Sequence, residues 1–365
     1  MKVRYNYLPQ QFANPDEIFA EIRELLKTGD FTLGKQVTEF EQKFASLIGS
    51  RYAVGVASGT DAIKLSLRAA GIGPGDEVIT AANTFIATVG AIAEIGAIPK
   101  FVDCNENYVL DVSKLEDHIT ENTKAIVPVH FTGEAVDMDE VIYQAAKYNL
   151  VVVEDACQSI LAKFNGQNCG TFGDAGAFSL HPLKNLNVWS DGGMIVTDDE
   201  NLYERLRLLR NHGLKDRDTI ACMGYNSRLD TIQAIVGNWL IPQAEEITKK
   251  RRENAAYYNK FLSGYVLLPP ERNNAESCYH LYMFQVDESI RDKLLKHLQD
   301  QGIDAKVHYP IPLYQQEGLK KYGYLAGDFP VTDRQAARLI SLPVDQHVTK
   351  EQLDYVIEKV IEFFA

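Results

Sequence analysis

The stretch DEVITAANTFIATVGAIAEIGAIPKFVD, residues 76–103, decides the fold class. It opens with a short β-branched run (DEVITA, 76–81), continues with an apolar segment (TFIATVGAIAEIG, 84–96) and closes with a second short run (IPKFVD, 98–103). A strand, a helix and a strand in this order form a crossover unit, which joins two parallel strands. The stretch therefore predicts an α/β fold with a mainly parallel central sheet and helices on both faces.

The same alternation extends along the chain in both directions. Helices are expected near residues 15–28 and from residue 37 onwards, and again at 112–118 and 139–148. Further strands are expected at KAIVPVH (124–130), LVVVED (150–155), AGAFSL (175–180) and GGMIVTDD (192–199). A long helical stretch follows at 228–262, with an interruption near Pro242.

The composition changes after this helical stretch. The turn-rich segment SGYVLLPPERNN (263–274) precedes the strand YHLYMFQV (279–286) and helices near 290–301, 332–340 and 350–364. A chain of 365 residues is too long for one ordinary core, because single cores stop growing at about 250–300 residues. We therefore predict a large domain at 1–245 and a smaller α+β domain at 246–365.

Charge and cysteine content exclude several classes of protein. The net charge of −13 opposes binding to the phosphate backbone of nucleic acids. The five cysteines form no CxxC pair, so neither a disulfide framework nor a zinc site is expected, and a reducing cytosol fits. The longest apolar stretch (87–99) contains Glu94 and is too short to span a bilayer. We expect a cytoplasmic protein without a metal and without a membrane partner.

Polar residues stand where several predicted strands end, and ligands of open parallel sheets bind at that edge. These residues are Asp103, His130, Asp155 and Ser179. In VVVEDACQ (151–158) the apolar run stops at Glu154 and Asp155, with Gln158 shortly after. Two interpretations are open. Asp155 either caps the next helix, or it is a buried carboxylate that pairs with a cationic group of a ligand.

The segment SGTDA (58–62) predicts a phosphate site. Gly59 allows close approach of the backbone, Thr60 offers a hydroxyl, and the helix that starts here presents free N–H groups. The same letters also fit an ordinary helix start. Neither G-x-x-x-x-G-K-[ST] nor a G-x-G-x-x-G between strand and helix occurs, which argues against a P-loop nucleotidase and a dinucleotide oxidoreductase.

Lys184 lies in the loop between two apolar strands of FSLHPLKNLNVWSDGGMIVTDD (178–199). A lysine in such a loop is usually a solvated charge. Here Pro182 stiffens the approach, and Gly192 and Gly193 permit tight packing after it. A lysine held inside such a loop has a lowered pKa, which Schiff-base chemistry requires.

Together these segments resemble the DegT/DnrJ/EryC1/StrS family of sugar aminotransferases, within the aspartate aminotransferase fold (fold type I). The resemblance covers nearly the whole chain. Its motifs are ASGTDAI (57–63), GPGDEVIT (73–80) with TFIAT (84–88), VVEDACQ (152–158), FSLHPLKN (178–185), GYNSRLDTIQA (224–234) and VHYPIPLY (307–314).

The resemblance implies pyridoxal 5'-phosphate as cofactor, with Lys184 bound to it as a Schiff base and moving protons during the reaction. Asp155 would lie against the pyridine nitrogen and keep it protonated, so that the ring withdraws electrons. Gln158 would bond the phenolic oxygen. Phe85 would stack on the ring, although a core aromatic is an equally open interpretation for it.

The remaining cofactor contacts implied by the resemblance concern the phosphate. Gly59, Thr60 and Ser179 would hold it, and Asn226 would reach the phosphate of the neighbouring subunit. Each active site would then need two chains, so a homodimer with shared sites is expected.

His308 and Tyr309 resemble residues at the sugar-binding mouth of the family, and a structural histidine remains the alternative for His308. Three features depart from the family pattern: Tyr314 where a histidine is common, the segment SILAKF (159–164), and Trp189 in the loop after Lys184. These departures put the identity of the sugar in doubt and leave the cofactor chemistry untouched.

The resemblance predicts a two-step transamination from L-glutamate to the keto group of a sugar linked to a nucleotide diphosphate. The product would be an amino sugar for a polysaccharide, another glycan or a secondary metabolite. One alternative is a sugar dehydratase that uses the same cofactor, but such relatives replace the lysine with histidine. Another is a non-catalytic binding or sensor protein, against which Lys184, Asp155 and Gln158 together argue.

Overall fold

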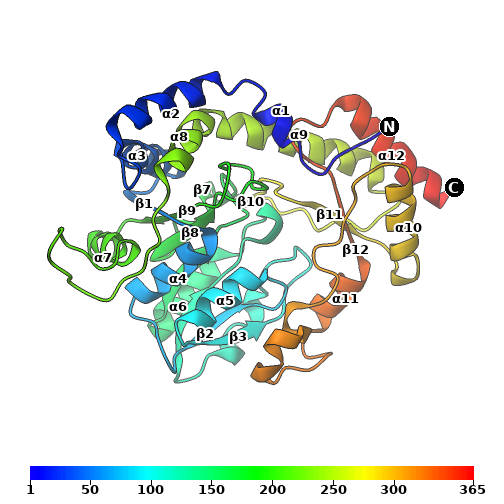
Figure 1. Cartoon of the computed structure of the whole chain (residues 1–365). Coiled ribbons are helices and arrows are strands. Elements are labelled where there is room, and N and C mark those ends of the chain that lie inside the picture. Colours follow the sequence, from blue (N-terminus) through cyan, green and yellow to red (C-terminus); the bar gives the residue numbers. More distant parts are fainter.

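A seven-stranded sheet forms the centre of the molecule (Figure 1). The computed structural model describes residues 1–365. The order across this sheet is β1-β9-β8-β5-β4-β2-β3. The bounds of these strands are β1 (Tyr52–Val56), β2 (Glu77–Ala81), β3 (Ile98–Val102), β4 (Thr123–Val127), β5 (Val151–Asp155), β8 (Ala175–Ser179) and β9 (Gly193–Thr197).

Five strands run parallel to one another, in the order β3, β2, β4, β5 and β8. Strand β9 is antiparallel to both β8 and β1. The predicted mainly parallel sheet is therefore confirmed. The helices of the chain are α1 (Leu8–Gln11), α2 (Asp16–Thr28), α3 (Lys35–Ile48), α4 (Gly59–Ala69), α5 (Ile86–Glu94), α6 (Met138–Tyr148), α7 (Glu200–Arg210), α8 (Thr231–Leu240), α9 (Ala244–Leu262), α10 (Glu288–Asp300), α11 (Pro330–Arg338) and α12 (Lys350–Phe364).

Alternation along the strands sends side chains to both faces of the sheet. In β5, Val153 packs among residues of α4, α5 and α7, whereas its neighbour Val152 packs among residues of α6. In β9, Ile195 joins the first group, whereas Met194 and Val196 pack with α2, α3 and α8. Helices therefore cover both faces, as the sequence predicts.

A second core lies beside the sheet. Two strands, β11 (Tyr282–Gln285) and β12 (Leu339–Leu342), pair antiparallel and pack with α10 and α12. Helix α9 connects the two cores, since Ala244 packs in the first and Leu262 in the second. The domain boundary at 245/246 stays a prediction. None of the helices combines the length and the apolar character needed to cross a membrane.

Some predicted elements differ from the structure. The strand expected to end at His130 stops at Val127, because Pro128 has no N–H for the ladder. The helix expected at 112–118 consists of two short 3-10 turns, Val112–Lys114 and Glu116–His118. The helix expected at 332–340 ends at Arg338, because Leu339 begins β12 and pairs with β11.

Other elements had no counterpart in the sequence analysis. These are α7 and a small sheet of β6 (Lys163–Phe164), β7 (Gln167–Asn168) and β10 (Ala275–Glu276). The predicted interruption near Pro242 is confirmed by a 3-10 turn, Ile241–Gln243, between α8 and α9.

A buried ion pair ties α3, β1 and α7 together. Glu41 binds Arg210, and both side chains are buried. Glu41 Oε1 also accepts a hydrogen bond from Gly55 N at 2.8 Å, and Arg210 Nη1 donates to Gly55 O at 2.9 Å.

We expect Glu41→Ala to lower the free energy of unfolding by about 3–5 kcal/mol, because it leaves the Arg210 charge buried without its partner. Urea denaturation followed by circular dichroism measures this change. The control is Glu24→Ala, which removes an exposed partner of Lys27 and is expected to change little. Equal stability of the two variants would contradict the structural role given to the pair.

Candidate active site

The carboxyl ends of β5 and β8 meet the first turn of α4. Strand β8 ends on Ser179, and Gly59 is the first residue of α4. A Cβ added at Gly59 would lie 2.7 Å from Ser179 Cβ and 2.9 Å from Cys157 Sγ. Only glycine fits between these two residues, so packing requires glycine here; the approach of the Gly59 backbone to a phosphate stays a prediction.

The first turn of α4 offers free donors at this point. The Ser58 side chain caps the helix and accepts from Asp61 N at 3.1 Å. The N–H groups of Gly59 and Thr60 have no partner inside the helix because they belong to its first turn. The partial positive charge of the helix N-terminus therefore faces the ends of β5 and β8.

Asp155 ends β5 with its carboxylate buried. Its Oδ2 accepts from Thr88 Oγ1 at 2.7 Å, and its Oδ1 accepts from Cys157 N at 3.1 Å. Thr84 Oγ1 lies 2.7 Å from Thr88 Oγ1. The sequence analysis did not single out either threonine, although both lie in the TFIAT motif.

Gln158 lies three residues beyond Asp155 and is also buried. Its Oε1 accepts from Thr132 N at 2.9 Å, which leaves its amide group free to donate. Thr132 has a left-handed backbone (φ 63°) and is fixed from the other side, because Leu281 N donates to its carbonyl at 3.1 Å.

Lys184 is half-buried in the loop between β8 and β9. Lys184 N donates to His181 O at 2.8 Å, and Asn187 Nδ2 donates to Lys184 O at 2.8 Å. Burial lowers the pKa of the Lys184 amine, and the nearby Cys157 and Asp155 oppose that shift. The expected lowering of the lysine pKa is thus found, and the amine lies within electrostatic range of Asp155.

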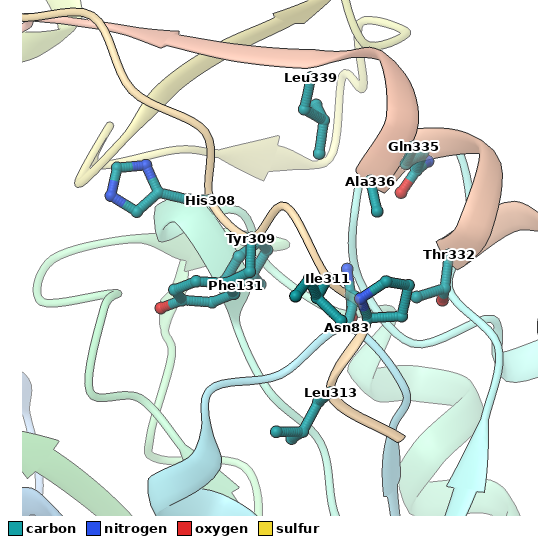
Figure 2. Close-up of a pocket in the computed structure, with 11 residues that line it drawn as sticks. Asn83, Phe131, His308, Tyr309, Ile311, Leu313, Thr332, Gln335, Ala336 and Leu339 are labelled. Carbon is teal, nitrogen blue, oxygen red and sulfur yellow. The ribbon is translucent and has the colours of Figure 1, made fainter. Parts of the chain in front are cut away.

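Tyr309, from the segment between α10 and α11, lies within electrostatic range of Asp155. Burial and then the Asp155 carboxylate raise the pKa of Tyr309 to about 12. The Tyr309 ring lies 5.7 Å from the ring of Phe85. It lies 5.9 Å from the ring of Phe131, and Figure 2 shows these two rings side by side. Phe85 is 49 % exposed, so it is not a core aromatic.

His308 precedes Tyr309, and its Nδ1 lies 2.9 Å from Ser341 Oγ. Burial and then the positive charges of Lys306 and Lys184 lower the pKa of His308 to about 4, so its imidazole is neutral at physiological pH. Beyond Tyr309 lies a hollow of about 460 Å³. Phe85, Ile86, Ile311 and Leu319 are among its lining residues.

Three of the residues discussed from the sequence stand apart from this cluster. Asn226 is exposed and lines a separate hollow with Ser190 and Arg228. Asp103 instead caps α11, since its carboxylate accepts from Val331 N at 3.0 Å and Thr332 N at 2.9 Å. His130 is fully buried, with Nε2 at 2.9 Å from Glu154 Oε2. Asp103 and His130 are thus structural, although they follow predicted strands.

A family model described as the DegT/DnrJ/EryC1/StrS aminotransferase family matches residues 13–361. The chain belongs to this aminotransferase family. The resemblance seen in the motifs is therefore confirmed over nearly the whole sequence.

Curated relatives in the family carry two kinds of name. A pleiotropic regulatory protein of Geobacillus stearothermophilus is 40 % identical over 353 residues, covering 95 % of this chain and 94 % of its own. A UDP-N-acetyl-3-dehydro-alpha-D-glucosamine 3-aminotransferase of Acidithiobacillus ferrooxidans is 42 % identical over 342 residues, covering 93 % and 91 %.

Solved structures of the family have the same fold. DesV of S. venezuelae, in complex with a ketimine intermediate, superposes with a TM-score of 0.96 at 36 % identity, covering 99 % of this chain and 98 % of its own. NtdA of Bacillus subtilis, with bound cofactor PMP, gives a TM-score of 0.92 at 31 % identity, covering 99 % and 85 %. The fold predicted from the family resemblance is confirmed.

The cap formed by Asp103 predicts a structural phenotype. We expect Asp103→Ala to lower the free energy of unfolding by about 1–2 kcal/mol, because two N–H groups of α11 lose their acceptor. Asp103→Asn keeps a capping oxygen and is expected to lose much less. Urea denaturation of both variants measures this, and an asparagine variant as unstable as the alanine variant would contradict the cap.

Proposed function

We propose that this protein is a pyridoxal 5'-phosphate-dependent aminotransferase that moves an amino group from L-glutamate to the keto group of a nucleotide-linked sugar, in amino-sugar biosynthesis. One observation carries the proposal: Lys184, whose amine pKa is lowered by burial, lies in the loop after β8, and the end of β8 packs against Gly59 at the start of α4. Family membership and the sugar-transaminase name of the Acidithiobacillus relative support the reaction and the substrate class.

The residues at this place fit the cofactor. Gly59 and Thr60 would hold its phosphate at the start of α4, with the Ser179 hydroxyl beside them. Phe85 would cover one face of the ring, and Gln158 would donate to the phenolic oxygen with its free amide. When bound, pyridoxal phosphate supplies an aldehyde that takes up amino groups and a ring that withdraws electrons.

Two side chains would handle the protons. Lys184 would bind the cofactor through Nζ and later hold and release the proton that leaves the substrate carbon. Its lowered pKa means that more of the amine is neutral at a given pH, and only the neutral amine is a nucleophile. Asp155 would accept a hydrogen bond from the ring nitrogen and keep the proton there.

The sugar would enter past Tyr309. The hydroxyl of Tyr309 lies within electrostatic range of Asp155, and the preceding residue is His308 with its neutral imidazole. Both are neutral polar groups, which suits the hydroxyls of a sugar. The adjoining hollow of about 460 Å³ has room for part of the substrate.

We further propose a homodimer with shared active sites. The segment from Asn211 to Asn226 follows α7 and projects from the body of the molecule (Figure 1). Two apolar side chains on it are strongly exposed, Ile220 at 67 % and Met223 at 87 %. This surface suits contact with a second copy, and the exposed Asn226 would then reach the cofactor phosphate of that copy. All five cysteines are free, which supports a cytoplasmic location.

The name of the Geobacillus relative favours a regulatory protein as the second candidate. A protein that only binds has no need of a lysine that moves protons, so Lys184 favours the enzyme. The dehydratase alternative is disfavoured by the same lysine.

The half-reactions separate these candidates. We expect the yellow cofactor-loaded protein to lose its colour when L-glutamate is added without a sugar, because the cofactor accepts the amino group. Adding a UDP- or dTDP-linked keto sugar is then expected to restore the colour and to give an amino sugar detectable by mass spectrometry. The control, Lys184→Ala, is expected to carry out neither step at a measurable rate. A protein whose colour ignores glutamate, or a sugar that loses water without gaining nitrogen, would contradict the proposal.

Mixed dimers test the shared site. Lys184→Ala and Asn226→Ala homodimers are each expected to be impaired. In a mixed dimer, one site carries both changes and the other carries none, so an equal mixture after subunit exchange is expected to recover about a quarter of wild-type activity. Activity no higher than the mean of the two homodimers would show that Asn226 does not act in the partner's site.

A further inference from the structure

Two threonines behind Asp155 form a chain of buried hydroxyl groups. Thr88 Oγ1 donates to Asp155 Oδ2 at 2.7 Å, and Thr84 Oγ1 lies 2.7 Å from Thr88 Oγ1. Thr84 is 1 % exposed and Thr88 is fully buried. Because bulk water does not reach these hydroxyls, each must find its hydrogen-bond partner inside the protein.

The bond to Asp155 fixes the direction of this chain. Thr88 Oγ1 donates its single proton to a carboxylate oxygen of Asp155, so it can only accept from Thr84. The short Thr84–Thr88 contact then requires Thr84 to donate to Thr88. A hydroxyl that receives a hydrogen bond donates a stronger one, so Thr84 reinforces the bond from Thr88 to the carboxylate.

Phe85 lies close to Thr88 at the start of α5. Phe85 is the N-cap residue of α5, and Thr88 is three residues further along. Residues three apart lie on the same side of a helix. The start of α5 thus presents both the exposed ring of Phe85 and the hydroxyl that binds Asp155.

We propose that Thr88, supported by Thr84, is a positioning residue that keeps the Asp155 carboxylate aimed at the ring nitrogen of the cofactor. The inference rests on the proposed function, in which Asp155 meets that nitrogen. Thr88 acts through Asp155 and not on the substrate. A carboxylate held in this way keeps the ring nitrogen protonated, because the proton is stabilised by a fixed negative charge.

Three variants separate this role from simple packing. Thr88→Val keeps the volume and removes the hydroxyl, whereas Thr88→Ser keeps the hydroxyl and removes a methyl group. Thr84→Val removes only the second hydroxyl. We expect the affinity of the apoprotein for pyridoxal phosphate to fall about tenfold or more in Thr88→Val, since hydrogen bonds to charged groups are worth about 1.5–3 kcal/mol. The loss in Thr84→Val is expected to be smaller, and Thr88→Ser is expected to retain most of the affinity.

The spectrum gives a second readout. In Thr88→Val we expect the colour change of the bound cofactor to move to higher pH, because a ring without its proton no longer repels a proton on the lysine nitrogen. A packing role predicts the opposite ranking, with the serine variant worse than the valine variant because it leaves a cavity. That ranking, or an unchanged colour transition in Thr88→Val, would overturn the inference.

A cofactor analogue that carries carbon in place of the ring nitrogen makes the test specific. We expect wild type and Thr88→Val to bind this analogue with equal affinity, because no ring nitrogen remains for Asp155 to hold. If Thr88→Val still binds it more weakly than wild type, the threonine acts on the fold and the inference is wrong. Failure of the wild-type protein to bind pyridoxal phosphate would instead contradict the proposed function itself, and the inference with it.

Discussion

The end of strand β5 is the constraint on which the site depends. Adjacent residues of a strand point to opposite faces, so Glu154 and Asp155 cannot share a role. Glu154 is fully buried and binds His130 at 2.9 Å, Gly170 N at 2.6 Å and Gly173 N at 2.8 Å. These bonds fix the strand end against the loops on either side of it. Asp155 is thereby held in place, with its carboxylate bound by Thr88 Oγ1 and Cys157 N.

Positive charge at the carboxyl ends of β5 and β8 contrasts with the negative net charge of the whole protein. The net charge is −13, yet the first turn of α4 and the Lys184 amine place positive charge at the ends of β5 and β8. The field of a helix N-terminus falls off within about one turn, so its effect is confined to the ligand it touches. A negative net charge is therefore compatible with the phosphate site proposed here.

The sequence was most informative where the pattern within one segment also determines the place of that segment in the fold. The alternation of short β-branched runs with apolar helical segments predicts the parallel sheet, and the abrupt end of VVVED locates Asp155 at its edge. Lys184 stood out because its loop contains proline and two glycines between strands, and Gly59 because it opens a helix directly after a strand. The position of a polar residue directly after a predicted strand was a weaker guide to its role. Asp103 and Asp155 follow strands in the same way, but one caps α11 and the other binds Thr88.

What the sequence could not supply depends on contacts between distant segments. Thr88 lies inside an apolar helical motif, and its bond to Asp155 joins residues 67 positions apart. The helix predicted at 332–340 includes Leu339 and Ile340, and only pairing with β11 makes these two residues part of a strand. Tyr309 lies far from Asp155 in the sequence, so its approach to that carboxylate follows from the fold alone. No periodicity in one segment encodes such pairings.

The central claim is that Lys184 is the residue that binds the cofactor. Borohydride reduction of the pyridoxal-phosphate-loaded protein, followed by digestion and peptide mass spectrometry, tests it directly because reduction makes the bond permanent. The account predicts a single modified peptide that contains Lys184, and loss of the label when L-glutamate is added before the reductant. A label spread over exposed lysines, or on a single lysine other than Lys184, would contradict it.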